Sequence, residues 1–215
     1  MRLLLAASFL CLATFISAAA EFPTIPPIVQ QWVEAQQHMG DIAVDFRLTR
    51  SLPTLKEPIT ADGRFWKQAD GQFRWEMGSP PTTVLLFDNK DLHVWDSDKQ
   101  AWQTLSANDG RMRMWMQFLN SKEMNAEAMT KTFTPTVTDE KPEVVTIALQ
   151  PKGLIVRKHL KQVDLQIDPR TKYLRQIRIL QSDDSSVIMT FGLPHPMAAA
   201  DKAKLLLPAS PKSAP

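Results

Sequence analysis

Cysteine is almost absent from the 215-residue sequence: the single one, Cys11, lies in an apolar N-terminal segment. This segment has the parts of a secretory leader, namely Arg2, an apolar run over residues 3–16 and small residues over 17–20. The run is short for a membrane span, so cleavage near Ala20 is favoured over an uncleaved anchor. Removal of this signal peptide leaves a chain without cysteine, which excludes disulfides and thiol chemistry.

Histidine is also scarce, and the four histidines are too far apart in the sequence to show metal-ligand spacing. They are His38, His93, His159 and His195. The sequence contains no glycine-rich phosphate loop, nucleophile elbow or Cys/His pair. The acidic pair Asp183–Asp184 favours a hairpin turn over a metal site. We therefore expect no catalytic centre, no metal and no cofactor, so the protein is not predicted to be an enzyme.

Neither sign of charge dominates, because 25 Lys and Arg residues face 23 Asp and Glu residues. The formal net charge is +2, and loss of Arg2 with the leader lowers it to +1 (2 − 1 = 1). A nucleic-acid binder would carry a concentrated basic face, so this class is excluded.

The length that remains after removal of the leader suits one domain, predicted over residues 21–196. Residues 197–215 are rich in Ala, Pro, Lys and Ser, which predicts a tail with little fixed structure.

Tryptophan is concentrated in residues 61–105, which hold four of the six. Short runs in this region alternate between apolar and polar residues and end in turn signals, a pattern typical of antiparallel strands joined by hairpins. In one run Phe73, Trp75 and Met77 point to one side and Arg74 and Glu76 to the other. One face of the predicted sheet is therefore bulky and apolar.

Helices are predicted at three places outside this region. A helix over residues 28–39 follows Pro26–Pro27 and ends at Gly40. Its apolar stripe favours packing on the sheet, with the alternative that it also lines a cavity. A methionine-rich helix over 111–120 and a second helical piece over 122–129 suit either a surface that fits varied apolar partners or ordinary core packing.

Further strands are predicted on both sides of the tryptophan-rich region. They cover residues 41–52, 59–68, 131–138, 143–150, 160–167, 173–180 and 186–193. Within residues 59–68, Phe65 and Gly63 share one face and Trp66 lies on the other.

Several of these short segments match, in order, the periplasmic outer-membrane lipoprotein carriers of the LolA-like family. The matching pieces are Gly63, Phe65, Phe73-Arg74-Trp75, Pro80, 84–87, Asp88-Asn89 and Val94-Trp95. The chain resembles this family over most of its length after the leader. The resemblance implies a mainly β fold with helices, in which a curved antiparallel sheet forms an incomplete β-barrel covered by a helical lid.

The resemblance also implies a binding site for lipid acyl chains on the concave face of the sheet. The expected cavity residues are Phe46, Phe65, Phe73, Trp75, Met77, Leu85 and Val94. The expected lid residues are Met112, Met114, Trp115, Phe118 and Leu119. At the turn where the family has a basic residue and proline, with an arginine that helps to hold the lid shut, this chain has Ala69–Asp70.

The function implied by the resemblance is that of a monomeric periplasmic carrier, which ferries the lipid chains of lipoproteins from the inner to the outer membrane. The implied partners are an inner-membrane ATP-driven transporter that releases lipoproteins and an outer-membrane lipoprotein receptor. Three alternatives remain open: a carrier of a non-protein lipid-linked molecule, an envelope sensor with the same fold, and a small enzyme that uses the cavity.

Overall fold

The computed structural model describes residues 25–97, 99–106 and 125–206. Their strands form one antiparallel sheet in the order β6-β5-β4-β3-β2-β1-β11-β10-β9-β8-β7, and β12 pairs with the start of β1. The strands are β1 (Ile42–Ser51), β2 (Ile59–Lys67), β3 (Phe73–Met77), β4 (Thr83–Phe87), β5 (Asp91–Asp96), β6 (Ala101–Ser106), β7 (Phe133–Lys141), β8 (Val144–Pro151), β9 (Leu160–Ile167), β10 (Leu174–Gln181), β11 (Ser186–Phe191) and β12 (His195–Pro196).

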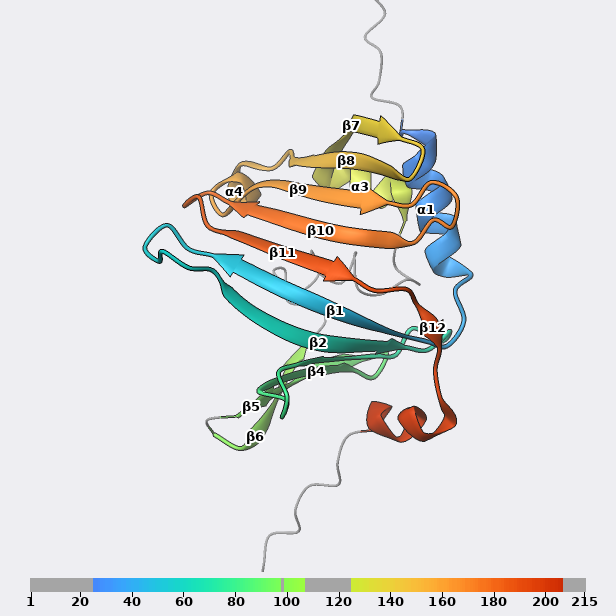
Figure 1. Ribbon diagram of the computed structural model, residues 1–215, viewed down its shortest axis with the longest axis vertical. Helices are drawn as coiled ribbons and strands as arrows, with labels where there is room; N and C mark the ends of the chain where they lie inside the picture. The colour runs from blue at the N-terminus through green and yellow to red at the C-terminus, as the bar shows by residue number, and fades with distance from the viewer. Residues whose placement is uncertain (1–24, 98, 107–124, 207–215) are drawn as a thin grey trace, which may run out of the picture.

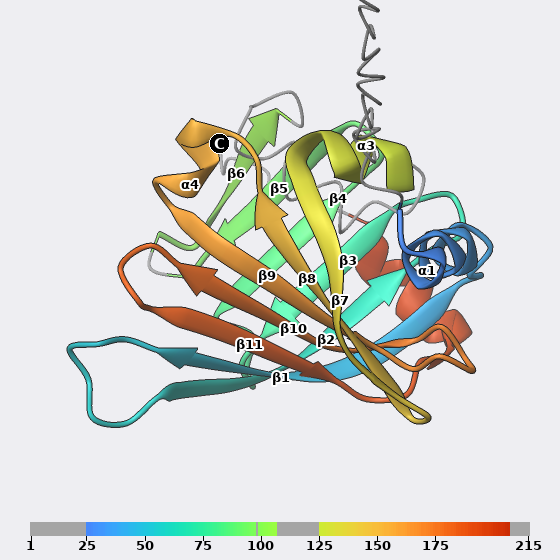
Figure 2. The ribbon, with the colours of Figure 1, turned by 90° about the horizontal axis from the view of Figure 1, so that it is seen from above.

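The sheet is strongly curved, as the two perpendicular views show (Figures 1 and 2). Strands β6 and β7 end the strand order, so the described sheet is not a closed barrel. The mainly antiparallel, incompletely closed fold expected from the sequence is confirmed. In the described part of the chain, no helix is long and apolar enough to span a membrane.

Within the described residues the sheet is accompanied by the helices α1 (Pro27–Gln37), α3 (Ala126–Thr132) and α4 (Leu154–Arg157) and by the 3-10 helix η1 (Ala199–Leu205). Pro27 occupies the first turn of α1, where its missing N–H costs nothing. Asn125 caps α3, because its side-chain oxygen accepts hydrogen bonds from the backbone N–H groups of Glu127 and Ala128. The second helical piece, predicted over 122–129, is found as α3 over Ala126–Thr132, three residues longer at its C-terminal end; residues 122–124 lie outside the described residues.

The strand register places alternate residues on the two faces of the sheet. On the inner face, Val44, Phe65, Trp75, Leu85 and Val94 are paired from one strand to the next across β1 to β5. The outer face carries the intervening polar residues. There, cross-strand ion pairs join Arg47 to Asp62 and Arg64 to Asp45, as period-two alternation requires.

The largest cluster of buried side chains lies where α1 and α3 pack on the inner face of β7 to β10. Val29 and Val33 of α1 and Met129 of α3 contribute to this cluster from the helices. From the sheet it includes Phe133, Val145, Ile147, Leu149, Leu160, Val163, Leu165, Ile167 and Ile179. This part of the inner face is an ordinary hydrophobic core, and Met129 belongs to it.

The C-terminal segment differs from the expected loose tail as far as residue 206. Met197 and Leu205 are buried against Trp66 on the outer face of the sheet, and Lys204 Nζ lies 4.5 Å from the centre of a Trp66 ring. Trp66 is the apolar outward-facing side chain predicted from the alternation, and Leu205 of η1 packs in the same buried cluster. Burial of these two apolar residues stabilises a fixed position that composition alone did not predict.

Candidate functional site

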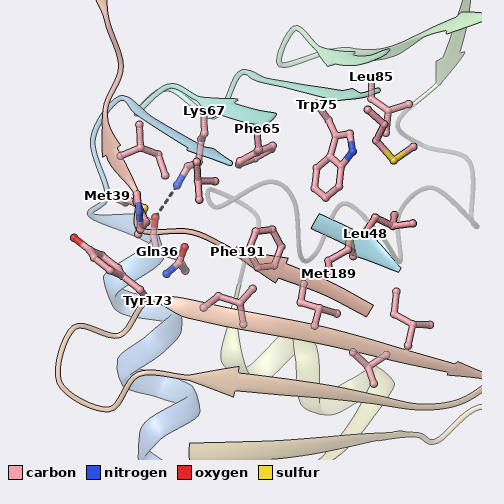
Figure 3. A pocket seen from close by; sticks show the side chains of 18 of the residues that line it. Gln36, Met39, Leu48, Phe65, Lys67, Trp75, Leu85, Tyr173, Met189 and Phe191 are labelled. Atoms are coloured by element: carbon pink, nitrogen blue, oxygen red, sulfur yellow. Dashed lines mark hydrogen bonds between the residues drawn. The ribbon is translucent and has the colours of Figure 1, made fainter. Parts of the chain in front are cut away.

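A cavity of about 400 Å³ lies on the inner face of the sheet, beside the helix-covered core. Its wall is built by residues of β1 to β5, β9 to β11 and α1, with Met39, Tyr173 and Pro194 from connecting segments. Almost all lining side chains are apolar, and Figure 3 shows several pointing into the same space. The lining residues are Trp32, Gln36, Met39, Ile42, Val44, Leu48, Phe65, Lys67, Trp75, Met77, Leu85, Leu92, Val94, Val163, Tyr173, Leu174, Ile177, Ile179, Met189, Phe191 and Pro194.

Five of the seven residues that the sequence suggested for a cavity line it: Phe65, Trp75, Met77, Leu85 and Val94. Phe46 and Phe73 do not line it, which corrects the expectation for these two. Phe73 is fully buried behind the wall, where its ring stacks on Phe87 at 5.4 Å and contacts Phe65 at 5.7 Å between ring centres. The alternation predicts on which face of the sheet a side chain lies, but it does not predict how deeply the side chain is buried there.

Phe46 supports the wall from the side, because its ring lies 4.2 Å from that of Trp75, measured between centres. The space for the Phe46 ring exists because the neighbouring residue on β2 is Gly63. A Cβ atom at Gly63 would lie 2.3 Å from Phe46 Cζ and 2.4 Å from the backbone oxygen of Glu76. Gly63 thus lets two bulky rings sit side by side in the wall.

Polar side chains gather at the end of the cavity next to α1 (Figure 3). Lys67 is buried there and donates a hydrogen bond of 2.9 Å from Nζ to the backbone oxygen of Gln36. No ion pair joins Lys67 to an Asp or Glu in the part of the chain that the structure describes. Burial lowers the pKa of Lys67 to about 8, so the side chain is still mostly protonated at neutral pH.

Sequence reasoning missed Lys67 and the contributions of β10, β11 and Tyr173. The signal for Lys67 was available, because it shares the inward parity of Gly63 and Phe65 on the same strand. For α1, both interpretations hold: Val29 and Val33 pack in the core, Gln36 lines the cavity, and Trp32 does both. The five predicted lid residues, Met112 to Leu119, lie outside the described residues.

Outside the cavity, polar side chains considered in the sequence analysis form hydrogen bonds that hold turns and strands together. His93, on the outer face of β5, is hydrogen-bonded to Asp88 Oδ2 and to Thr104 Oγ1, at 3.0 Å each, which ties the β4–β5 turn to β6. Asp183 lies in the β10–β11 turn and accepts a hydrogen bond from the backbone of Ser185. Among the described residues, no group of three or more His, Cys, Asp or Glu side chains is placed to hold a metal ion.

The family relationship is decided by sequence over most of the chain. A family model described as "Outer membrane lipoprotein carrier protein LolA" matches residues 38–204. The chain belongs to the LolA family. The matched region contains every strand of the sheet and every cavity residue except Trp32 and Gln36. LolA-family carriers act in the periplasm and bind lipoproteins without catalysing a reaction. A search of curated proteins gives no significant match.

Solved structures with a similar arrangement share little sequence with this LolA-family chain. A LolA superfamily protein from Nitrosomonas europaea is 10% identical, with 81% of this chain and 96% of that chain covered and a TM-score of 0.40. MucB of Pseudomonas aeruginosa, solved with MucA, is 13% identical (84% and 61% covered, TM-score 0.41). LprF from Mycobacterium bovis is 15% identical (81% and 97% covered, TM-score 0.41).

Proposed function

We propose that this LolA-family protein is a periplasmic carrier that holds the acyl chains of a lipoprotein, or of another lipid-linked molecule, in the inner-face cavity. The observation that carries the proposal is the cavity itself. Its wall combines aromatic rings with Met39, Met77 and Met189 and has few polar groups. Methionine side chains adapt to irregular apolar partners, which suits cargo chains of varied length and path.

Transfer of an acyl chain through water requires such a container. Burial of each methylene is worth about 0.8 kcal/mol, so an unshielded chain would return to a membrane or aggregate. Release at the destination requires that the filled and empty states differ little in free energy. A wall without a fixed pattern of hydrogen bonds meets both needs, because it binds apolar chains without exact fit.

The proposal includes the partners expected for the family. An inner-membrane ATP-driven transporter would load the carrier, and an outer-membrane lipoprotein receptor would accept the cargo. It also includes cleavage of the leader near Ala20 and a cover for the cavity formed by residues 111–120; Met129, which was expected to extend this cover, lies in the core instead. Hydrogen exchange with and without dodecanoate tests the cover: protection of residues 111–120 is expected to change, and unchanged exchange there would remove the cover from the proposal.

Native mass spectrometry of the protein released gently from the periplasm tests the function. The expected spectrum contains the chain without its leader together with species heavier by the mass of a lipid or lipoprotein. A Leu85→Glu variant should lose these heavier species while remaining folded, because Leu85 lines the cavity and a charge there opposes apolar cargo. A wild-type protein that is consistently free of lipid and takes none from vesicles would contradict the proposal.

A further inference from the structure

The cavity is not uniformly apolar, and its polar side chains are gathered at one end. Lys67, Gln36 and Tyr173 lie together beside α1, whereas Leu48, Leu85 and Met189 lie toward the other end (Figure 3). Removal of an ammonium group from water costs free energy, so a wall that only excludes water is not expected to contain a buried lysine. The polar end therefore needs an explanation beyond shielding.

Lys67 is the central group at this end. One of its three N–H donors is satisfied by the backbone oxygen of Gln36, at 2.9 Å. Its charge is balanced by no carboxylate within residues 25–97, 99–106 and 125–206. Lysine is rarely buried without a partner of opposite charge, so a bound anion would complete the site.

Other residues that line the cavity also carry hydrogen-bond donors. The buried indole Nε1–H of Trp32, one turn before Gln36 on α1, has no hydrogen-bond partner among the described residues. The half-buried Tyr173 contributes a hydroxyl, for which no hydrogen bond to a described residue is found. The Gln36 amide nitrogen already donates to the backbone oxygen of Lys172, at 3.4 Å. A cation with donors that lack a partner among the described residues matches a ligand that supplies oxygen acceptors with negative charge.

We propose that the cavity binds its cargo in one orientation, with an anionic head group, a carboxylate or a phosphate, held by Lys67 and the acyl chain extending toward Leu85. This inference rests on the proposed function, since it requires that an acyl chain fills the cavity. It adds a substrate class, acyl chains with a terminal anion, that the apolar wall alone does not specify. Burial lowers the pKa of Lys67 to about 8, and a bound anion would favour the protonated form again.

The test is a fluorescence titration of the intact mature protein at pH 7 with three ligands of equal chain length: dodecanoate, dodecyl phosphate and dodecanol, all below their micellar concentrations. The wild type should bind at least one of the two anions about tenfold or more tightly than the alcohol, as expected for a buried charge-assisted hydrogen bond. The preferred anion identifies the head group. Lys67→Met should bind the three ligands with similar affinity, because its side chain retains the shape without the charge.

Lys90→Met is the matched control, because Lys90 lies exposed in the β4–β5 turn and its replacement changes the net charge equally. This variant should keep the wild-type preference, and thermal unfolding should show that both variants are folded. Wild-type binding of dodecanol as tightly as the anions, or a preference that survives in Lys67→Met, would overturn the inference while leaving the carrier function standing. Failure of the wild type to bind any of the three would overturn both.

Discussion

The inner face of the sheet has two parts that differ in what packs against them. In the part formed by β7 to β10, aliphatic side chains such as Ile147 and Leu165 are fully buried under α1 and α3. In the part formed by β1 to β5, side chains such as Phe65 and Trp75 border a cavity, whose wall is completed by β9 to β11. Both parts have the same alternation and the same antiparallel pairing. The comparison shows that the strand pattern makes an apolar face in both parts, and that, among the described residues, packing of α1 and α3 fills one of them as core.

Phe73→Glu should reduce stability more than any change in the cavity lining, because it places a carboxylate behind the cavity wall. Phe73 is fully buried against Phe65 and Phe87, so the charge would have no solvent or partner. We expect a loss of about 3–5 kcal/mol in the free energy of unfolding, the scale for an uncompensated buried charge. Urea unfolding measures it. Near-normal stability of this variant would show that Phe73 borders the cavity after all.

Leu165→Ala and Leu85→Ala compare the two parts directly. Leu165 is fully buried in the core, so its truncation should cost about 2–5 kcal/mol in the free energy of unfolding. Leu85 borders space that is already present, so its truncation leaves no new closed void and should cost less than about half as much. Equal losses in urea unfolding would contradict the distinction between core and cavity.

Gly63→Ala should cost about 1–3 kcal/mol, since the new methyl group overlaps the Phe46 ring and the backbone oxygen of Glu76. The Phe46 ring would have to move from its place beside Trp75, so tryptophan fluorescence should also change. Gly40→Ala is the control, because a Cβ there has nothing within 4 Å. The same stability for both variants would remove the steric role given to Gly63.

Asp168→Asn, in the β9–β10 turn, should have an effect that depends on pH. Hydrogen bonds from the backbone of Thr171 and from Arg175, together with one from the backbone of Arg170, hold the pKa of Asp168 well below its usual range. The carboxylate therefore stabilises the fold above the ordinary aspartate pKa of about 4, and this contribution is lost as the pH falls below it. Thermal unfolding of wild type and variant should differ at pH 7 and converge toward pH 2. A difference that is constant with pH would contradict the role of the charge.

Period-two alternation and turn residues are local signals, so they were sufficient for the antiparallel strands and their faces, whereas the incompletely closed sheet was expected only from the resemblance to the LolA-like family. Trp66 illustrates this success, since its outward direction follows from its neighbours. The position of the C-terminal segment did not follow, because it depends on two apolar residues, Met197 and Leu205, that meet Trp66 only in the fold. The depth of Phe73 and the burial of Lys67 are likewise tertiary properties, set by strands and helices distant in sequence.

Methionine-methyl NMR during titration with dodecanoate tests the central claim most directly, because the described methionines sample both parts of the sheet and its outer face. Met39, Met77 and Met189 line the cavity, whereas Met129 lies in the helix-covered core and Met197 on the outer face. The account predicts large, saturable shifts for the three cavity methyl groups and little change for the other two. Saturable shifts confined to Met129 or Met197, or no shift at Met39, Met77 and Met189, would contradict an acyl-chain site in this cavity.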